Sequence, residues 1–342
     1  MIAAVWDTRE PLAAAFRDRW AALAAEAPQF NFSMDAACLA HEAAQGRHAL
    51  AAVLEDGGRR AALVLRREGQ GFVSGHPWRW QLARAAPPEA EIAIPSAADC
   101  AWGFRAAGEL ARGARVHVHL PAAPPRGTAG YAAGGTLLLR LDPPEEALLA
   151  AMDVNKRRAV RKAVKEGFSV TDAGTLEELR AYHQLQLEEN EWRGPASAAP
   201  ASGAIPATGQ GWREWELPWM RLLVAARSGV VEAGSGFALS SGGTMDYRAN
   251  ASTPAARKAG ANAQLAYAAI QAAKQAGCRL MNWGGVTEFK RELGGVRTPV
   301  WCWLGGGGLW KPANHFVAGS RNAQRALAAR WKTLRAKEKS NP

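Results

Sequence analysis

The sequence predicts an α/β protein made of two units in tandem. The chain has 342 residues, which is enough for two domains of ordinary size, each with its own core. Helical and strand-like hydrophobic patterns alternate along both halves. A segment rich in Pro, Ala and Gly, from Pro121 to Gly135, is typical of a loop between them. We therefore divide the chain into units 1–135 and 136–342.

In the first unit, hydrophobic residues at helical spacing predict three helices, at residues 8–25, 34–45 and 101–112. Asp56-Gly57-Gly58 separates two apolar runs and predicts a β-hairpin. The predicted strands are residues 49–54, 60–65, 72–73 and 115–120. His117 and His119 would share one face of the last strand. No third ligand accompanies them, so we favour solvated or hydrogen-bonded histidines over a metal pair.

The second unit begins with a predicted strand at 136–141 and a helix with Asp142 as its N-cap. Thr175 and Glu178 have the spacing of a capping box, which predicts a helix to about Trp192. Residues 194–211 are typical of a mobile loop. The other predicted helices are 212–222, 254–276 and a basic C-terminal helix at 315–337. The other predicted strands are 222–226, 230–239, 244–249, 280–283 and 298–304.

The segment from Lys156 to Lys165 is densely basic, because six of its ten residues are Lys or Arg. As a helix it would stack three cations at every fourth position, where like charges repel and reduce helix stability. Two interpretations stay open, a solvated surface and a face that contacts phosphates. The candidate phosphate-binding or tRNA-binding residues are Lys156, Arg157, Arg158, Arg161, Lys162 and Lys165.

Charge and cysteine content narrow the function classes. The net charge of +11 favours polyanionic partners, such as nucleic acid, a nucleotide-linked substrate or an anionic membrane face. The four cysteines form no CxxC pair, so we expect buried thiols in a reducing cytosol, with no metal site. The absence of a secretory signal pattern and of a run of ~18 uncharged apolar residues also favours a cytoplasmic protein. No GxSxG, GxGxxG or P-loop occurs, which argues against hydrolase, dinucleotide and NTPase functions.

Four short patterns carry a family likeness. They are Lys156-Arg157-Arg158-x-x-Arg161-Lys162-Ala163 followed by Gly167, Tyr247-Arg248-Ala249 near Ala251-Ser252, Asn262-Ala263-Gln264-Leu265, and Gly284-Gly285 with Phe289-Lys290. On these residues the chain resembles the FemABX family, aminoacyltransferases of peptidoglycan bridge formation within the GNAT-like acyl-CoA N-acyltransferase superfamily. The likeness covers the second half well. The first half matches loosely, through Phe30-x-Phe32-Ser33 and its strand order.

The resemblance implies a fold of two tandem GNAT-like units, each a mixed central sheet flanked by helices. It implies transfer of an amino acid from aminoacyl-tRNA, as co-substrate and without another cofactor, to an amine of a peptidoglycan precursor, small peptide or natural product. The family's Phe-Lys pair matches Phe289 and Lys290, which puts Lys290 at the acyl-transfer centre. The family has an aromatic residue before the following glycine, and this chain has Leu293 there.

The implied chemistry needs few groups. An aminoacyl ester already reacts with amines, so catalysis consists mainly of positioning and of stabilising the developing oxyanion. One well-placed cation, here Lys290, contributes about 3 kcal/mol, or about a hundredfold in rate. A surface lysine is the competing interpretation of that residue. The candidate substrate-binding residues are Tyr247, Arg248, Trp283, Gly284 and Gly285: Arg248 for an anionic acceptor group, and the glycines for close backbone approach.

Two alternatives remain open from the sequence. The first is an acyl-CoA-dependent N-acyltransferase, since Arg257-Lys258-Ala259-Gly260-Ala261-Asn262 nearly fits the glycine turn that holds a pyrophosphate at a helix start. The second is a non-enzymatic module that binds RNA or an anionic membrane surface through the basic helices at 156–165 and 316–337.

Overall fold

The computed structural model describes the chain except for residues 28, 70, 74–81, 85–93, 194–216, 309 and 341–342. It divides into two compact units, Met1–Thr136 with Thr298–Pro342, and Leu137–Arg297. This corrects the division expected from the sequence, which placed residues 298–342 in the second unit. The cause is strand pairing: Trp301–Gly305 of β13 (Val296–Gly305) pair antiparallel with β6 (Arg115–Leu120), a strand of the first unit.

The first unit is a mixed sheet with strand order β1-β2-β3-β4-β6-β13-β7. Neighbours are antiparallel from β1 to β4 and for β6 with β13, whereas β4 and β6 run parallel. The remaining strands of this unit are β1 (Ile2–Asp7), β2 (Ala49–Asp56), β3 (Arg59–Glu68), β4 (Gly71–Val73), β5 (Leu82–Arg84) and β7 (Ala129–Arg140). The predicted hairpin is confirmed as β2 and β3, which pair in register from Ala49 with Arg66 to Asp56 with Arg59.

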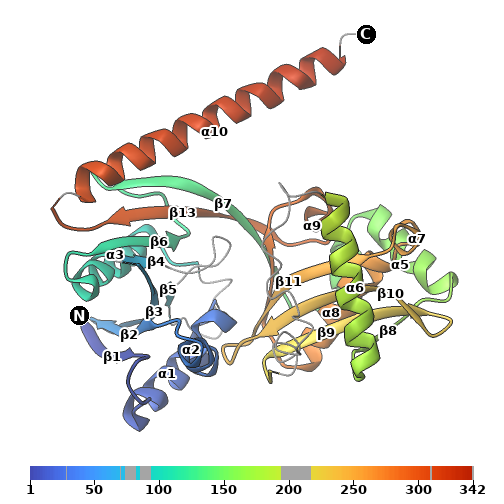
Figure 1. The fold of residues 1–342 in the computed structure, drawn as a ribbon, viewed down its shortest axis with the longest axis horizontal. Coiled ribbons are helices and arrows are strands. Elements are labelled where there is room, and N and C mark those ends of the chain that lie inside the picture. Colours follow the sequence, from blue (N-terminus) through green and yellow to red (C-terminus); the bar gives the residue numbers. More distant parts are fainter. Residues whose placement is uncertain are drawn as a thin grey trace. The chain divides into compact units, whose positions relative to one another are not determined.

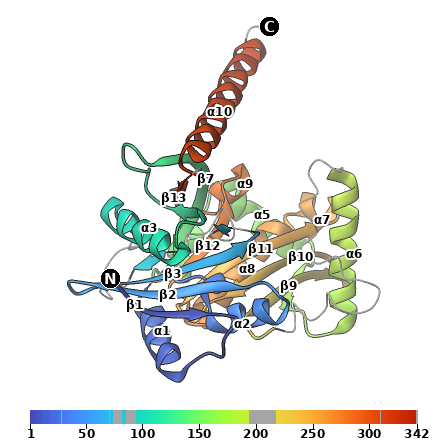
Figure 2. The same ribbon diagram turned by 60° about the vertical axis from the view of Figure 1, so that its left-hand side comes forward.

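Helices cover both faces of this sheet. Figure 2 shows α1 (Ala14–Glu26) and α3 (Ala97–Ala111) on opposite sides of β2 and β3. Because side chains alternate along a strand, Leu63 packs with α3 whereas Val64 packs with α1. A short 3₁₀ turn, Phe32–Met34, and α2 (Ala36–Ala44) complete this part of the chain.

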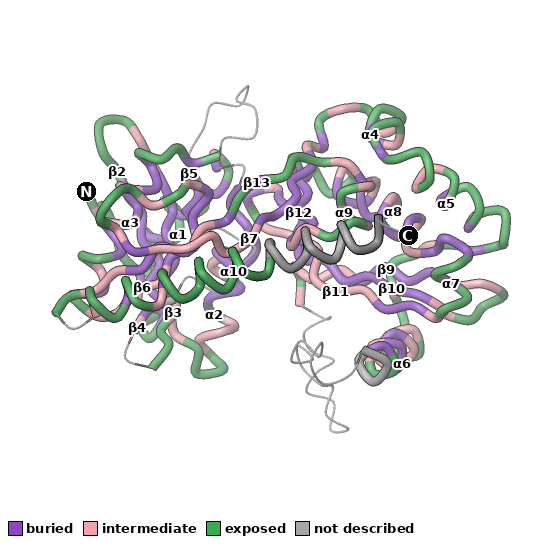
Figure 3. The backbone as a smooth tube through the Cα atoms, turned by 90° about the horizontal axis from the view of Figure 1, so that it is seen from above, coloured by how far each residue is buried: buried purple, intermediate pink, exposed green. Residues whose placement is uncertain are grey.

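The C-terminal helix α10 (Trp310–Ser340) belongs to the first unit, and Figure 1 shows it extending away from the sheet of that unit. Near its start, Ala318 and Val317 pack on Ala129, Cys302 and Leu304. Farther along, Arg325 donates a hydrogen bond to the carbonyl of Ala133 at 2.8 Å. Most of its described side chains are exposed (Figure 3), Phe316 to 79%. In the described parts of the chain, no helix is both long enough and apolar enough to traverse a lipid bilayer.

The second unit is also a mixed sheet, with the order β7-β12-β11-β10-β9-β8. The strands from β8 to β11 are antiparallel neighbours, and β11 is parallel to β12. The strands are β8 (Ser169–Asp172), β9 (Met220–Arg227), β10 (Val230–Leu239), β11 (Thr244–Ser252) and β12 (Leu280–Gly285). The helices are α4 (Glu145–Ala151), α5 (Val154–Lys165), α6 (Leu176–Arg193), α7 (Pro254–Ala259), α8 (Ala261–Gln275) and α9 (Glu288–Arg291).

Two cores hold the second unit together. On one face, Leu265 and Ile270 of α8 pack with Phe237 and Trp283. On the other face, α6 packs Tyr182 and Leu185 on β9 and β11, and Figure 1 shows this helix crossing the strands. The predicted capping box of α6 is confirmed, because Thr175 Oγ1 accepts from Glu178 N and Glu178 Oε2 accepts from Thr175 N.

Several predicted boundaries were wrong. The helix expected over 254–276 breaks at Gly260, whose left-handed φ of 95° ends α7 and begins α8. Strand β7 begins at Ala129, inside the expected loop, since its small residues pair with neighbours despite low β-propensity. Asp142 does not cap α4, because its carboxylate accepts two hydrogen bonds from Arg140 at 2.9 Å. The loop expected at 194–211 lies outside the described residues.

His117 of β6 makes the free energy of unfolding depend on pH. Burial, then the charges of Arg115 and His119, lowers its pKa from 6.5 to about 4. Within the described residues, no hydrogen-bond partner reaches its buried Nε2. No group of three or more metal-ligand side chains gathers in the described parts either. At neutral pH the low pKa keeps the imidazole of His117 uncharged. The expectation of a solvated or hydrogen-bonded ring is corrected at Nε2, which is buried without a described partner.

Replacing His117 by Leu should flatten the fall of stability on acidification. The unfolded chain protonates this imidazole near pH 6.5 and the folded chain near pH 4. The contribution of His117 to the free energy of unfolding is therefore fully present above pH 6.5, and it decreases as the pH falls from 6.5 towards 4. The check is the Tm at about pH 7.5 and about pH 5. A His315→Leu variant, at an exposed position of α10, is the control. Equal acid sensitivity of both variants and the parent would contradict this assignment.

Candidate functional site

The candidate site lies where two parallel strands separate. In the described structure, β11 and β12 pair at three positions, Thr244–Asp246 with Leu280–Asn282. Strand β11 then continues to Ser252. The chain after Asn282 turns away, because Asn282 Oδ1 accepts from Gly284 N at 2.9 Å and Gly284 adopts a left-handed φ of 71°. Ligands in open α/β sheets bind outside the carboxyl ends of the strands, so this divergence is the place to look for a site.

An aromatic cluster with one lysine occupies this position. Lys290 Nζ lies 4.1 Å from the centroid of the Tyr247 ring, a cation–π contact. Tyr247 follows directly after Asp246, the last residue of β11 that pairs with β12. Its ring meets Phe237 edge-on at 5.8 Å and Trp283 at 6.3 Å. Since Lys290 is half-buried, its ammonium is fixed against a ring rather than extended into bulk solvent.

The short helix α9 positions Lys290. Thr287 is its N-cap, and Thr287 Oγ1 accepts from Lys290 N at 3.3 Å. After α9, the chain is held at Gly295, where a Cβ atom would lie 2.8 Å from the carbonyl oxygen of Leu138. Opposite the ammonium, a Cβ on Gly284 would lie 3.8 Å from Lys290 Nζ. The buried turn at Gly284 therefore lies directly beside the ammonium, and its left-handed φ favours glycine.

Helix α5 supports α9 from the side. Lys156 Nζ lies 4.6 Å from the centroid of the Phe289 ring and 2.9 Å from Glu292 Oε2. The backbone N–H of Asp153, the N-cap of α5, donates to Glu292 O at 2.8 Å. Phe289 thus contacts the basic helix rather than the Tyr247 ring, and Lys156 is occupied with an acidic partner.

The basic residues of α5 divide into two groups. Arg157 donates to the carbonyls of Ala150 and Met152, which end α4. Lys162 donates to Lys258 O at 2.9 Å and also lies near Glu166. The more distant cations Arg158, Arg161 and Lys165 are exposed. Lys156, Arg157 and Lys162 therefore make structural contacts. The other three cations form the basic face, which we define as Arg158, Arg161 and Lys165.

Helix α5 also covers the glycine turn at the start of α8. A Cβ on Gly260 would fall well inside contact distance of Ala159 O, so the α5 backbone packs directly on this glycine. Gly260 and Ala261 are both buried. In the acyl-CoA alternative this turn would have to receive a pyrophosphate at the helix start. Because α5 covers this turn, the structure does not support the acyl-CoA alternative.

A polar network that the sequence did not predict lies on the part of β11 that pairs with β10 but no longer with β12. Asn250 Nδ2 donates to Ser235 Oγ at 2.8 Å and to Gly234 O at 3.1 Å. Asn262 Nδ2 donates to Ser252 Oγ at 3.1 Å, and Arg257 Nη2 donates to Ser252 O at 3.1 Å. The two bonds of Asn250 join the outer half of β11 to β10, and the two bonds to Ser252 join it to α8 and α7. The only sequence signal for this network was the near match of Arg257 to Asn262 to a pyrophosphate-binding glycine turn. In the structure, Arg257 and Asn262 instead hydrogen-bond to Ser252 of β11.

Tyr182 of α6 stays neutral beside this network. It is fully buried, and burial raises its pKa well above 10, with smaller contributions from Tyr247 and Glu189. Its hydroxyl accepts from Gln186 Nε2 at 3.2 Å. The ring packs so closely on Gly234 that any side chain there would clash.

The structure thus brings some predicted site residues together and separates others. Tyr247, Gly284 and Lys290 meet, and Gly285 and Arg248 adjoin them in sequence. Trp283 is completely buried, so it supports the Tyr247 ring from within the core and does not face a substrate. The expectation that Trp283 binds substrate directly is therefore corrected.

Comparison with known proteins identifies the fold. No protein-family model matches the chain, and no curated protein sequence does. Among solved structures, FemX superposes with a TM-score of 0.59 at 12% identity, over 92% of this chain and 100% of that one. The chain has the FemX fold. A tandem GNAT protein of the clavulanic acid biosynthesis pathway is more distant, with a TM-score of 0.44 at 16% identity over 89% of this chain and 99% of that one. The FemX likeness confirms the expected pair of GNAT-like units with mixed sheets.

Proposed function

We propose that the chain is an acyltransferase that moves an amino acid from aminoacyl-tRNA to the amine of a second substrate. The observation that carries this proposal is the position of Lys290. Its ammonium is fixed on the Tyr247 ring, at the point where the parallel strands β11 and β12 stop pairing, next to the turn at Gly284. The likeness to FemX supports the same function, because the Phe289-Lys290 pattern independently implies a protein of that type.

The reaction requires charge stabilisation more than acid or base strength. The acceptor amine attacks the ester carbonyl, and a C–N bond forms as the carbonyl oxygen takes on negative charge. The Lys290 ammonium stabilises this oxyanion. The C–O bond to the ribose then breaks, and the proton lost by the amine goes to the departing ribose oxygen. Tyr247 holds the ammonium in one place, so little reorganisation is needed during the reaction.

The two substrates would use different residues. The basic face of α5, Arg158, Arg161 and Lys165, suits the phosphates of the tRNA. Arg248 follows Tyr247 on β11 and suits an anionic group of the acceptor, a peptidoglycan precursor or other peptide, through bidentate hydrogen bonds. Charged tRNA as donor would place the reaction in the cytoplasm.

A donor competition tests the function directly. The full chain is incubated with amine acceptors and either a pool of tRNA charged with labelled amino acids or labelled acetyl-CoA, and amide products are measured. We expect label transfer from charged tRNA. Transfer from acetyl-CoA alone would replace this proposal by the acyl-CoA alternative. Binding of tRNA without any transfer would reduce the protein to a binding module.

Removing the basic face should weaken tRNA binding without changing the fold. In the triple variant R158Q/R161Q/K165Q, three phosphate contacts are lost, so the slope of log K against log salt should become shallower by about two to three. Filter binding of tRNA over a range of salt concentrations measures this. A matched triple variant in the first unit, R17Q/R19Q/R105Q, removes three exposed cations and should bind as the parent does. Identical slopes for the two variants would exclude α5 as the tRNA contact.

A further inference from the structure

A separate cavity of about 690 Å³ lies within the first unit. It is bounded by β1, β2, the start of β4 and the C-terminal end of α3. Gly71 of β4 pairs there with Arg115 of β6, so the cavity lies at the amino ends of these parallel strands. This is the end opposite to the one where ligands of α/β sheets usually bind. Its volume is in the range of small-molecule sites, about 300–1,000 Å³.

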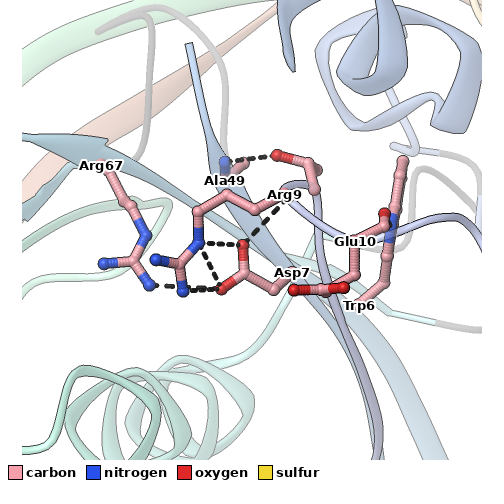
Figure 4. Close-up of polar contacts among 7 residues, drawn as sticks. Trp6, Asp7, Arg9, Glu10, Ala49 and Arg67 are labelled. Atoms are coloured by element: carbon pink, nitrogen blue, oxygen red, sulfur yellow. Dashed lines mark hydrogen bonds and ion pairs between the residues drawn. The ribbon is translucent and has the colours of Figure 1, made fainter. Parts of the chain in front are cut away.

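One carboxylate holds two guanidinium groups at this cavity. Figure 4 shows Arg9 and Arg67 converging on Asp7. Arg9 Nη2 lies 2.5 Å from Asp7 Oδ2, and Arg67 Nη2 lies 3.3 Å from the same oxygen. The hydrogen bond from Arg9 is the largest cause that lowers the pKa of Asp7 to about 2, so the carboxylate stays charged. Two positive groups thus share one negative partner, which leaves a local excess of positive charge for a second anion.

A third cation stands at the C-terminal end of α3. Arg112 has a left-handed φ of 49°, at a position where glycine is the usual residue. Its side chain is exposed, and it forms no ion pair with any residue that the structure describes. Together with Arg9 and Arg67 it gives three lining cations against two acids, Asp7 and Glu109.

The rest of the cavity wall is apolar. Leu50 and Phe72 are buried, and Val5 on the edge strand β1 is 45% exposed. Ile2 and Leu110 complete this surface. The Arg67 guanidinium lies 5.0 Å from the centroid of the Phe72 ring, so charged and apolar surfaces meet directly. An inorganic anion would leave the apolar wall exposed to water, and a neutral hydrocarbon would leave the cations without an anionic partner.

We propose that this cavity binds an amphipathic anion, a carboxylate or phosphate group attached to a hydrocarbon body. The anionic group pairs with Arg67 and Arg112, and the hydrocarbon lies on Leu50, Phe72 and Val5. All lining residues belong to the first unit, so the site is independent of Lys290 and of the transfer reaction proposed for it.

Isothermal titration calorimetry of the full chain with decanoate tests the site. We expect saturable binding with a Kd below about 1 mM, clearly tighter than that of decanol or of inorganic phosphate. The variant R112Q should weaken decanoate binding by about tenfold or more, since a hydrogen bond to a charged group is lost. Its exposed side chain makes no described ion pair, so the fold is not at risk. The variant R67Q should weaken binding similarly.

The control is R105Q, which removes an exposed arginine of the same helix outside the cavity. It should bind decanoate as the parent does. Absence of saturable decanoate binding would overturn the proposal, and so would equal affinity for decanol. Equal binding by R112Q and R105Q would show that the lining arginines are not the anion partners. Preference for inorganic phosphate over decanoate would contradict the role of the apolar wall.

Discussion

The variant K290Q should lose about a hundredfold in kcat for amino-acid transfer while it keeps its fold. The glutamine removes the positive charge and retains most of the volume beside Tyr247. Loss of one preorganised group that stabilises an oxyanion corresponds to about 3 kcal/mol in the activation free energy. Because this interaction strengthens only as the oxyanion forms, the loss should appear in kcat and leave KM nearly unchanged. Steady-state kinetics with a charged tRNA donor measure both constants.

The neighbouring variant R291Q provides a matched control for K290Q. Arg291 lies one residue along the same short helix, and its side chain is exposed. It should retain activity within about twofold, as expected for a surface substitution. Circular dichroism and Tm should be alike for the two variants. If K290Q transfers amino acids as fast as R291Q does, Lys290 is not the oxyanion partner.

The variant G260A should destabilise the protein by about 2–4 kcal/mol. Its left-handed backbone costs about 1 kcal/mol for a residue with a Cβ. The added methyl group would also collide with Ala159 O, and overpacking of this kind costs about 1–3 kcal/mol. Helix α5 would have to move away from α8. Urea denaturation, read as a change in midpoint at constant slope, measures the effect.

The control for G260A is G167A, which separates backbone conformation from steric clash. Gly167 has a similar φ of 82°, but a Cβ there would meet nothing within 4 Å. It should cost only the conformational part, about 1 kcal/mol. Equal destabilisation by G260A and G167A would mean that the close packing of α5 on α8 adds nothing to stability.

Features fixed by local chemistry were predicted well from the sequence. The β2–β3 hairpin follows from Asp56-Gly57-Gly58, and the start of α6 follows from the Thr175–Glu178 capping box. The basic helix over Lys156 to Lys165 was also expected, and it forms as α5. These signals act over a few residues, so they survive in any tertiary context.

Features fixed by distant contacts were predicted poorly. Strand β7 begins in an Ala- and Gly-rich segment with low β-propensity, so the sequence pattern did not predict it. The strand forms because it pairs with β12 and β13. The break at Gly260 depends on the approach of α5, about a hundred residues earlier in the sequence. The assignment of residues 298–342 depends on pairing with β6.

The same distinction applies to the candidate site. The family pattern singled out Phe289 and Lys290, but the roles of the two side chains differ. Lys290 contacts Tyr247, whereas Phe289 contacts Lys156. Neither contact could be inferred from spacing, because the partners lie on strand β11 and helix α5. The network of Asn250, Ser252 and Asn262 was missed because isolated polar residues carry no periodic signal.

The return of β13 to the first unit has a consequence for the folding of the newly made chain. Since β13 supplies the first unit with a strand next to β6, residues that are made after the second unit complete the sheet of the first. On the ribosome, the amino-terminal unit must wait, with the edge of β6 uncovered, until the whole intervening unit has emerged. Neither unit can therefore be obtained by cutting the gene at one point, and a chaperone that shields exposed strand edges should speed maturation of the nascent chain.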